Sequence, residues 1–375
     1  MEKGKYQYYI GPEGPKGASL AIVAEQPGPD ELDNLIQTGI GRPLIGTTGR
    51  AVDRHLLNIG TARSEVYLTN AQRHFNAWRG PDGRWVIPTP SREALVEQQV
   101  ELLRELSNLP NLNCVIAMGA KALASLSNFH MDEIGNWRGS ILQTCFGKKM
   151  VPTYHPSFYF HGEWRYRTIV EFDLARALEE SRTPDLVLPA RDFYLEPTYN
   201  ELCDWHAELM AAPVCSYDIE LFRGGHVSCI AFSDRPDRAF CYPIMRGNRQ
   251  PYWPVHEEAS VWRKIDALLN RQGVMYVSQN GPFDSWHLWR HGVRTTPGLN
   301  HVDLMHMHRV LAPDLPHALQ FTVSIYTREP YYKDESGDWR SEIRVPDRQF
   351  WTYNCKDAAC TLEAAYAMIE DMREL

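Results

Sequence analysis

Residues 214–221 read VCSYDIEL, and this stretch decides the fold of the second half of the chain. Apolar and β-prone residues surround two acids, which is typical of a buried β-strand rather than of a solvated strand edge. Asp218 and Glu220 stand two residues apart, so a strand places both carboxylates on the same face. Two adjacent anions repel each other unless water or a cation lies between them. The pair therefore indicates a candidate metal site.

Two segments further along the chain carry acids at matching spacings. SQNGPFDSW places Asn280 and Asp284 four residues apart, directly after the apolar run MYV. YNCKDAACTLEAA places Tyr353 and Asp357 four residues apart in a predicted helix, and hence on one helical face. The acids thus follow the order D-x-E, N-x3-D and Y-x3-D.

With these motifs in this order, the second half of the chain resembles the proofreading 3′–5′ exonucleases of the DEDD class, in the subclass with a tyrosine in the last motif. The segments HVDLMHMHRVLAPDLPHALQFTVSIYT, EPYYKDE and YNCKDA are similar to the exonuclease domain of bacteriophage family A DNA polymerases. The resemblance covers about residues 185–375. It implies a ribonuclease H-like fold and hydrolysis of the terminal phosphodiester at DNA 3′ ends.

The same resemblance implies a role for each motif residue. Two divalent ions would be held by carboxylates, one by the first and third motifs and one by the first and second: Asp218, Glu220, Asp284 and Asp357. Oxygen ligands favour Mg²⁺ or Mn²⁺ over zinc. Tyr353 would orient the attacking water, and Asn280 would contact the substrate.

Composition and charge limit the class of protein. A chain of 375 residues suggests two domains, and 43% hydrophobic residues suffice for real cores. A net charge of −8 argues against indiscriminate coating of nucleic acid, but it is compatible with a nuclease whose metal ions meet the phosphates. The eight cysteines form no C-x2-C pair, which favours reduced thiols in a cytoplasmic protein. We find no signal peptide and no apolar run long enough to span a membrane.

The first half alternates predicted strands and helices, which favours a largely parallel three-layer α/β domain. Predicted strands include SLAIVAEQ, EVYLTNAQ, NCVIAMG and MVPTY, and residues 1–18 are expected to lie over the surface. The segment RTPDLVLPARDFYLEPT carries three prolines and marks a junction. We therefore expect one domain over residues 1–182 and a second over residues 183–375.

Residues at the predicted carboxyl ends of these strands carry a second resemblance. AEQPGPDE, GRPLIGTTGRAVDRHL, TN and HPS follow in the order found in the family-four and related uracil-DNA glycosylases, over about residues 19–180. Such an enzyme binds a base flipped out of the stack. By this resemblance, Asn70 reads the edge of uracil and His155 lies near its O2. The pocket residues implied are Glu25, Gln26, Leu44, Asn70 and His155.

The departures from this family predict weak or absent excision. Residues 1–20 and the helix REALVEQQVELL lack the cysteines that hold the family-four iron–sulfur cluster, so we expect no cluster. Leu44 stands where an aromatic residue usually stacks on uracil. EQPG, TNAQRHF and TPSR lean toward the uracil-crosslinking branch, yet Ile87 and Pro88 stand where that branch has a histidine.

Taken together, the chain is expected to be a metal-dependent 3′–5′ proofreading exonuclease with an inactive or weakly active glycosylase-like domain that guides DNA. We expect it to act on single-stranded or frayed DNA 3′ ends in the cytoplasm of a phage-infected bacterial cell, beside a DNA polymerase in cis or as a separate subunit, and without a membrane. One alternative is a uracil-DNA glycosylase with an accessory exonuclease domain. Another is a non-catalytic DNA-binding module of a split phage polymerase.

Two smaller expectations concern the second domain. Trp286 and Trp289 are expected to pack in the core rather than to stack on bases. Four arginines are candidates to follow the phosphates: Arg223, Arg246, Arg249 and Arg340.

Overall fold

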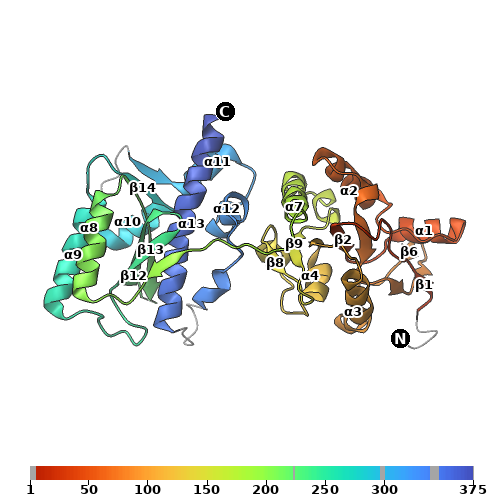
Figure 1. Ribbon diagram of the computed structural model, residues 1–375, viewed down its shortest axis with the longest axis horizontal. Helices are drawn as coiled ribbons and strands as arrows, with labels where there is room; N and C mark the ends of the chain where they lie inside the picture. The colour runs from red at the N-terminus through yellow and green to blue at the C-terminus, as the bar shows by residue number, and fades with distance from the viewer. Residues whose placement is uncertain (1–5, 223, 296–299, 338–345, 375) are drawn as a thin grey trace. The chain divides into compact units, whose positions relative to one another are not determined.

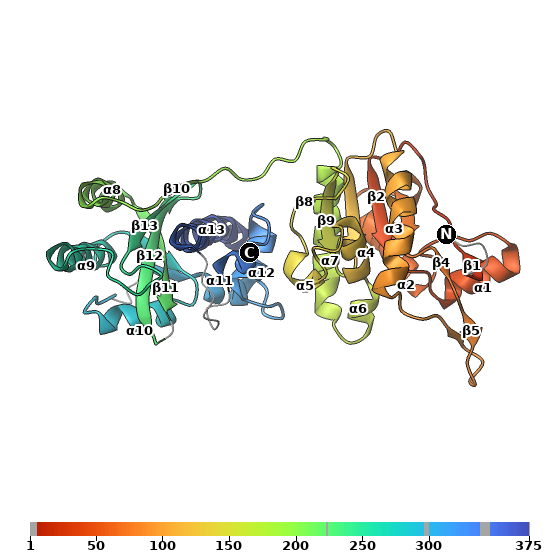
Figure 2. The ribbon, with the colours of Figure 1, turned by 90° about the horizontal axis from the view of Figure 1, so that it is seen from below.

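The computed structural model describes residues 6–222, 224–295, 300–337 and 346–374. Contacts divide the chain into two units, Met1–Leu188 and Pro189–Leu375, which are described separately. Both units combine a β-sheet with covering helices (Figures 1 and 2). The α/β class expected for both halves is therefore confirmed.

The first unit is built on a five-stranded sheet with the strand order β3-β2-β7-β9-β8, in which only β8 runs antiparallel to its neighbour. The strands of this unit are β1 (Tyr8–Tyr9), β2 (Leu20–Ala24), β3 (Tyr67–Asn70), β4 (His74–Phe75), β5 (Trp78–Arg79), β6 (Trp85–Val86), β7 (Cys114–Met118), β8 (Leu142–Gln143) and β9 (Lys149–Thr153). Its helices are α1 (Pro29–Thr38), α2 (Thr47–Asn58), η1 (Arg63–Glu65), α3 (Arg92–Ser107), α4 (Ala120–Leu126), α5 (Ile134–Trp137), α6 (Ser157–Phe160), η2 (Trp164–Tyr166) and α7 (Arg167–Glu180).

The central strands of this sheet are buried on both faces, which explains why they read as continuous apolar runs. Every residue of β2 and β7 is buried. Helices α2 and α7 cover one face and α3 and α4 the other, giving three layers (Figure 1). Helix α3 begins where the sequence predicts, because the Ser91 hydroxyl accepts a hydrogen bond from the Ala94 N–H at 3.2 Å.

The N-terminal segment is packed more tightly than the sequence suggests. Strand β1 pairs with β4, and Ile10 is fully buried. Ile10 belongs to a small apolar cluster with Leu32 and Phe75, against which Tyr8 and Trp85 pack. The expectation that residues 1–18 lie over the surface is therefore wrong for this part of the segment. A single buried isoleucine forms no periodic pattern, so the sequence gives no sign that this segment is packed.

The second unit is built on a six-stranded mixed sheet with the order β10-β13-β12-β11-β14-β15. Its strands are β10 (Asp192–Tyr194), β11 (Val214–Phe222), β12 (His226–Arg235), β13 (Arg238–Pro243), β14 (Met275–Ser278) and β15 (His301–Asp303). Its helices are α8 (Tyr199–Ala211), α9 (Val255–Leu269), α10 (Gly281–Arg290), α11 (Leu304–Leu311), α12 (Leu319–Tyr326), η3 (Lys333–Ser336) and α13 (Asp347–Arg373). Strands β11, β12 and β13 form an antiparallel meander, and β14 adds in parallel to β11. This is the strand order expected of a ribonuclease H-like fold.

Two helical layers cover this sheet. Helices α8 and α9 lie on one face and the long helix α13 on the other (Figure 2). Small residues line the face of α13 that packs against the sheet, including Cys355, Ala358 and Ala359, all fully buried. They allow the helix to approach the strands closely, which brings its polar residues near those of β11.

Two further findings concern the whole chain. All eight cysteines are free thiols, and six of them are buried. Among the residues that the structure describes, no helix combines the length and the apolar character that crossing a membrane requires.

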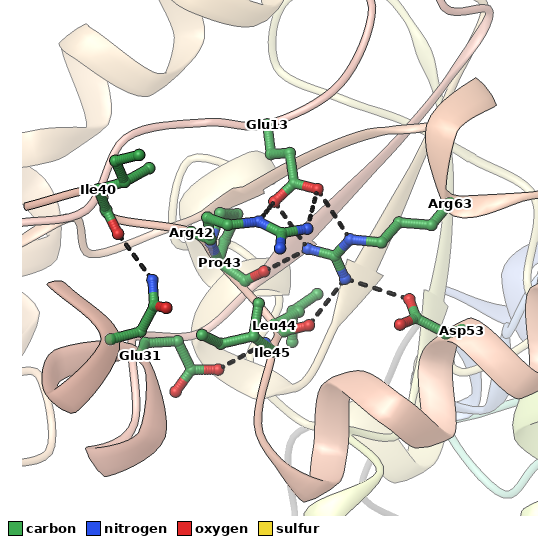
Figure 3. A network of polar contacts seen from close by, with 10 residues as sticks. Glu13, Glu31, Ile40, Arg42, Pro43, Leu44, Ile45, Asp53 and Arg63 are labelled. Atoms are coloured by element: carbon green, nitrogen blue, oxygen red, sulfur yellow. Dashed lines mark hydrogen bonds and ion pairs between the residues drawn. The ribbon is translucent and has the colours of Figure 1, made fainter. Parts of the chain in front are cut away.

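A network of ion pairs holds the loop between α1 and α2 (Figure 3). Glu13 accepts hydrogen bonds from both Arg42 and Arg63, at 2.8 to 3.1 Å. Arg63 also donates to the carbonyl oxygens of Pro43 and Leu44, at 2.6 and 2.7 Å. Burial raises the pKa of Glu13, but the hydrogen bonds from the two arginines outweigh burial and lower this pKa to about 2.

We predict that Glu13→Gln destabilises the first unit in a pH-dependent way. Because the folded state lowers the pKa of Glu13 from 4.5 to about 2, the stabilisation by its charge is complete above pH 4.5 and is lost as the pH falls toward 2. Calorimetric unfolding of the full chain should show a lower midpoint for the variant at neutral pH, and a gap that narrows by about pH 3. Glu163→Gln, at an exposed ion pair, is the control. A gap that does not change with pH would contradict this account.

Candidate functional site

Three carboxylates of the second unit form an acidic cluster. Asp218 and Glu220 leave the same face of β11, and Asp357 comes from α13. One ligand oxygen of each lies within 4.8 Å of the other two. The strand pairing shifts register directly after Glu220, and such bulges often lie beside functional sites. The structure thus brings together the first and third predicted motifs.

Helix α13 is fixed to β11 by polar contacts on both sides of the cluster. The Ser216 hydroxyl donates to the Ala358 carbonyl at 2.7 Å, with both residues fully buried. Asn354 donates its side-chain amide to the Asp218 carboxylate at 2.7 Å and to the Asp218 carbonyl at 3.2 Å. The position of Asp357 relative to Asp218 is therefore set by the scaffold rather than by flexible side chains.

In this cluster, burial and the repulsion between carboxylates raise the pKa values of Asp218 and Glu220. Burial and then the charge of Asp357 raise the pKa of Asp218 to about 8. Burial and the charge of Asp218 also raise the pKa of Glu220 well above its ordinary value. A bound divalent ion would remove this repulsion, and a set of carboxylate oxygens is what Mg²⁺ or Mn²⁺ prefers. The residues present therefore fit such an ion.

The second motif lies beside the cluster. Asp284, in the first turn of α10, is 3% exposed. It does not belong to the group of three whose oxygens lie within 4.8 Å, but its pKa is raised well above normal, first by burial and then by the charge of Asp218. Asn280 stands at the start of α10 in a left-handed backbone conformation, with a φ of 59°. The carboxylate of Asp303 accepts its backbone N–H at 3.1 Å.

Two residues of the site escaped the sequence analysis, although the segment EPYYKDE contains both. The ammonium group of Lys333 lies 2.6 Å from each carboxylate oxygen of Asp357 and 2.9 Å from the Tyr353 hydroxyl. The Tyr332 hydroxyl donates to the same carboxylate at 2.6 Å. A lysine directly after two aromatic residues was the available signal, but no regular spacing links it to the acids.

Aromatic side chains on α10 correct one expectation. Trp286 and Trp289 are 58% and 59% exposed, so the prediction that they pack in the core is wrong. Their rings stack with centroids 5.6 Å apart, and Phe283 beside them is 49% exposed. All three lie on the helix whose buried side carries Asp284. Of the arginines considered for phosphate contacts, two lie outside the described residues, Arg223 and Arg340.

The first unit gathers polar residues at the carboxyl ends of neighbouring parallel strands. Glu25 and Gln26 follow β2, Asn70 ends β3 and His155 follows β9. The register pairs Ala24 with Asn70, so the ends of β2 and β3 are adjacent. Ligands of open α/β sheets bind at this edge. The structure thus places the predicted pocket residues on one edge of the sheet.

Glu25 itself is held in place by the backbone after β7. Its carboxylate accepts the Lys121 N–H at 3.0 Å. Gly119 has a φ of 101°, and a Cβ there would lie 2.6 Å from the Glu25 carboxylate, so a side chain at this position would collide with it.

Asn70 carries the clearest sign of a ligand. The residue is 1% exposed, and neither its amide nitrogen nor its amide oxygen has a hydrogen-bond partner among the described residues. The Gln26 side-chain oxygen is likewise buried without such a partner. Each unpaired buried polar group costs about 1–3 kcal/mol of stability, so a native fold keeps such groups where a ligand or water pairs with them. An amide offers both a donor and an acceptor, as the edge of a pyrimidine does.

Leu44 is held in an unusual conformation next to this edge. Its φ of 52° is left-handed, which is uncommon for a bulky residue, and its side chain is 5% exposed. Arg63 holds its carbonyl, and the Glu31 carboxylate accepts the next N–H, that of Ile45, at 3.0 Å (Figure 3). A Cβ at Gly49 would lie 1.8 Å from the Leu44 carbonyl oxygen, so the first turn of α2 requires a glycine at its third position. These contacts fix the backbone of the loop, and the Leu44 side chain that it presents is aliphatic rather than aromatic.

The surroundings of His155 favour its neutral form. Burial lowers its pKa below the ordinary value, and the opposing charges of Glu25 and Glu31 do not compensate. Its Nδ1 lies 2.7 Å from the Ser157 hydroxyl, which orients the ring. A neutral imidazole can donate one hydrogen bond to an anion developing on a bound base.

Residues 12–172 match the family model described as "Uracil DNA glycosylase superfamily". The chain is 29% identical over 170 residues to the type-4 uracil-DNA glycosylase of Thermotoga maritima, an alignment that covers 44% of this chain and 79% of that protein.

Solved structures resemble this chain only loosely. The EXO domain of Nibbler from Aedes aegypti has a TM-score of 0.40 and 15% identity, over 50% of this chain and 94% of that domain. The catalytic core of RRP6 from Trypanosoma brucei has a TM-score of 0.35 and 14% identity, over 49% of each chain, so this chain spans about half of that core. The chemistry of the second unit must therefore be argued from its own residues. For the first unit, the likeness to the uracil-DNA glycosylase superfamily extends over residues 12–172, which is less than half of the chain.

Proposed function

We propose that the chain is a metal-dependent 3′–5′ DNA exonuclease of the proofreading type. The observation that carries the proposal is the convergence of the carboxylates of Asp218, Glu220 and Asp357 within 4.8 Å of one another, with the Tyr353 hydroxyl close to Asp357. Water would attack the phosphorus of the terminal phosphodiester, and the bond to the 3′ oxygen would break. The products are a nucleoside 5′-monophosphate and a strand shortened by one nucleotide.

Each residue of the proposed site would have its own role. Asp218, Glu220 and Asp357 would hold one divalent ion, and Asp218 with Asp284 a second. Bound ions lower the pKa of water and stabilise the leaving oxyanion. Tyr353 would orient the attacking water. Its pKa is raised above the ordinary value, chiefly by burial and then by the charge of Asp357, so the phenol stays protonated and acts as a donor rather than as a base.

Single-stranded or frayed 3′ ends are the substrates that we propose. The exposed, stacked rings of Trp286 and Trp289 support this choice, because bases of a single strand stack on aromatic side chains whatever their identity. The resemblance to phage polymerases supports a DNA polymerase as the partner, in cis or as a separate subunit, in the cytoplasm of an infected bacterial cell.

A second candidate function belongs to the first unit. We infer that it binds a uracil-like base at Asn70 but excises it slowly or not at all. The unpaired amide of Asn70 supports base binding. Leu44 lacks an aromatic face, and the loop with Ile87 and Pro88 has no histidine for crosslinking. The absence of an iron–sulfur cluster remains an expectation from the missing cysteines.

Asp218→Ala should abolish digestion of 3′-labelled single strands while the protein stays folded. The variant removes the ligand that both proposed ions share. A chelator should abolish digestion by the wild type, and added Mg²⁺ or Mn²⁺ should restore this activity. Asp192→Ala, on the exposed strand β10 three strands away, is the matched control. Undiminished digestion by Asp218→Ala would refute the site.

Tyr353→Phe and Asp357→Ala should fail in different ways. Losing one orienting hydrogen bond typically costs about 10²–10³ in rate, so Tyr353→Phe should lower kcat by that factor and leave metal affinity unchanged. Asp357→Ala should weaken Mn²⁺ binding itself, and excess Mn²⁺ should rescue it in part. Tyr366→Phe, more exposed on the same helix, is the control. Equal rescue of both variants would mean that Tyr353 only packs against its neighbours.

Asn70→Ala should weaken binding of uracil-containing DNA without lowering the thermal stability of the chain. The stability should even rise, because the substitution removes a buried amide that lacks partners. Binding is measured by fluorescence anisotropy, with Asn108→Ala at an exposed position as the control. Excision should be slow or undetectable in the wild type, with no covalent adduct. Rapid formation of abasic sites that depends on His155 and Asn70 would show that the domain is an active glycosylase.

A further inference from the structure

The acidic cluster already contains a cation of the chain's own, Lys333. Its ammonium group contacts both oxygens of Asp357 at 2.6 Å and the Tyr353 hydroxyl at 2.9 Å. The ammonium also lies 4.7 Å from the centroid of the Tyr353 ring. The side chain is 17% exposed and that of Asp357 is 5% exposed, so water screens this ion pair poorly.

Neighbouring residues anchor Lys333 at the site. Tyr332 is 4% exposed and donates to Asp357 at 2.6 Å. Two residues beyond Lys333, Glu335 pairs with Lys356 of α13 through both of its oxygens, at 2.7 and 2.8 Å. The short helix η3 is thus tied to α13 on both sides of the lysine. The contact between Lys333 and Asp357 therefore depends on a backbone segment that is held in place, rather than on the flexibility of a long surface side chain.

The contacts of Asp357 limit how it can bind a metal ion. Each carboxylate oxygen has about two acceptor positions. One oxygen of Asp357 already accepts from both Tyr332 and Lys333, and the other accepts from Lys333. The Tyr353 hydroxyl also hydrogen-bonds to this carboxylate. A divalent ion must therefore displace one of these donors or share an oxygen with the ammonium group.

We propose that Lys333 is an internal counter-cation and positioning residue of the exonuclease site. It neutralises Asp357 when no metal is bound, competes with the divalent ion for that carboxylate, and holds the Tyr353 oxygen as an acceptor. With its lone pair engaged by the ammonium, the Tyr353 hydroxyl can only donate its own hydrogen, to the Asp357 carboxylate in the metal-free chain and to the attacking water once a metal ion takes that oxygen. This inference rests on the proposed function, and it adds a positively charged group to a site otherwise described by its acids.

Loss of the Lys333 charge should strengthen metal binding and slow catalysis. We expect Lys333→Met to bind Mn²⁺ about tenfold more tightly than the wild type, because a like charge within about 4–6 Å disfavours a second cation by a power of ten or more. We expect kcat on single-stranded DNA to fall about 10²-fold, since Tyr353 loses the donor that orients it, with little change in KM. A residue with a merely structural role would not tighten metal binding.

The experiment is a Mn²⁺ titration of the full chain by isothermal calorimetry, alongside 3′-end digestion. Lys264→Met is the control, because Lys264 is a half-buried lysine of α9, the helix on the face of the sheet opposite α13. It should bind Mn²⁺ as the wild type does. Lys333→Arg keeps a cation on the carboxylate and should restore the wild-type affinity. Mn²⁺ binding by Lys333→Met that equals or falls below the wild type would overturn the proposal.

Two further outcomes are informative. If Lys333→Met unfolds without metal, recovery on adding Mn²⁺ supports a counter-cation role, and failure to recover contradicts it. Calorimetry also separates this inference from the proposed function. If Asp218→Ala digests DNA normally, the exonuclease assignment fails, whereas the effect of Lys333 on Mn²⁺ affinity is measured without any nuclease activity.

Discussion

The second unit depends on one electrostatic constraint, the repulsion among carboxylates that the fold forces together. Asp218 and Glu220 share a strand face, and α13 is packed so closely on that strand that Asp357 joins them. The raised pKa of Asp218 is the local sign of this repulsion. Such an arrangement fits a site that binds cations. The small residues of α13 bring Asp357 close to the strand, and the ammonium of Lys333 supplies one positive charge there.

The first unit depends on a different constraint, which is the burial of polar groups without partners. Asn70 ends the edge strand β3, and its amide has no partner among the described residues. Glu31 and Arg63 hold the loop around Leu44, whose φ is left-handed. Leaving buried polar groups unpaired lowers the stability of the free protein, but it keeps them available to a ligand. Glu25, Asn70 and His155 lie at or just after the carboxyl ends of parallel strands of one sheet, and Leu44 offers an aliphatic rather than an aromatic side chain. These features support the proposal that this unit binds a base without excising it efficiently.

The two candidate sites share a structural principle. Both sites lie at strand ends or on strand faces of α/β sheets, where the backbone is rigid. In both, a charged side chain from outside the motifs supports the site: Arg63 in the first unit and Lys333 in the second. These supporting residues come from short 3₁₀ segments rather than from the sheets.

Much of the fold was readable from local patterns. Apolar runs predicted β2, β7, β9 and β11 because strands buried on both faces need no alternation. Two-residue and four-residue spacings predicted which acids share a face. The same logic failed where packing was not periodic. Strand β1 is too short to carry a pattern, and the tryptophans of α10 lie on the solvent side of a helix whose apolar content suggested a core position.

Residue type and spacing along regular elements predicted the α/β class of both units and the acids of the second unit, whereas the polar residues of the first unit were expected from the family resemblance alone. The contact of the Lys333 ammonium with Asp357, 24 residues away, follows only from the tertiary structure, and so does the lack of a partner for the Asn70 amide among the described residues. Spacing fixes which side chains share an element, but it carries no information about contacts that a loop makes with a distant helix. Nor can it reveal an unpaired group, since pairing depends on every neighbour in space.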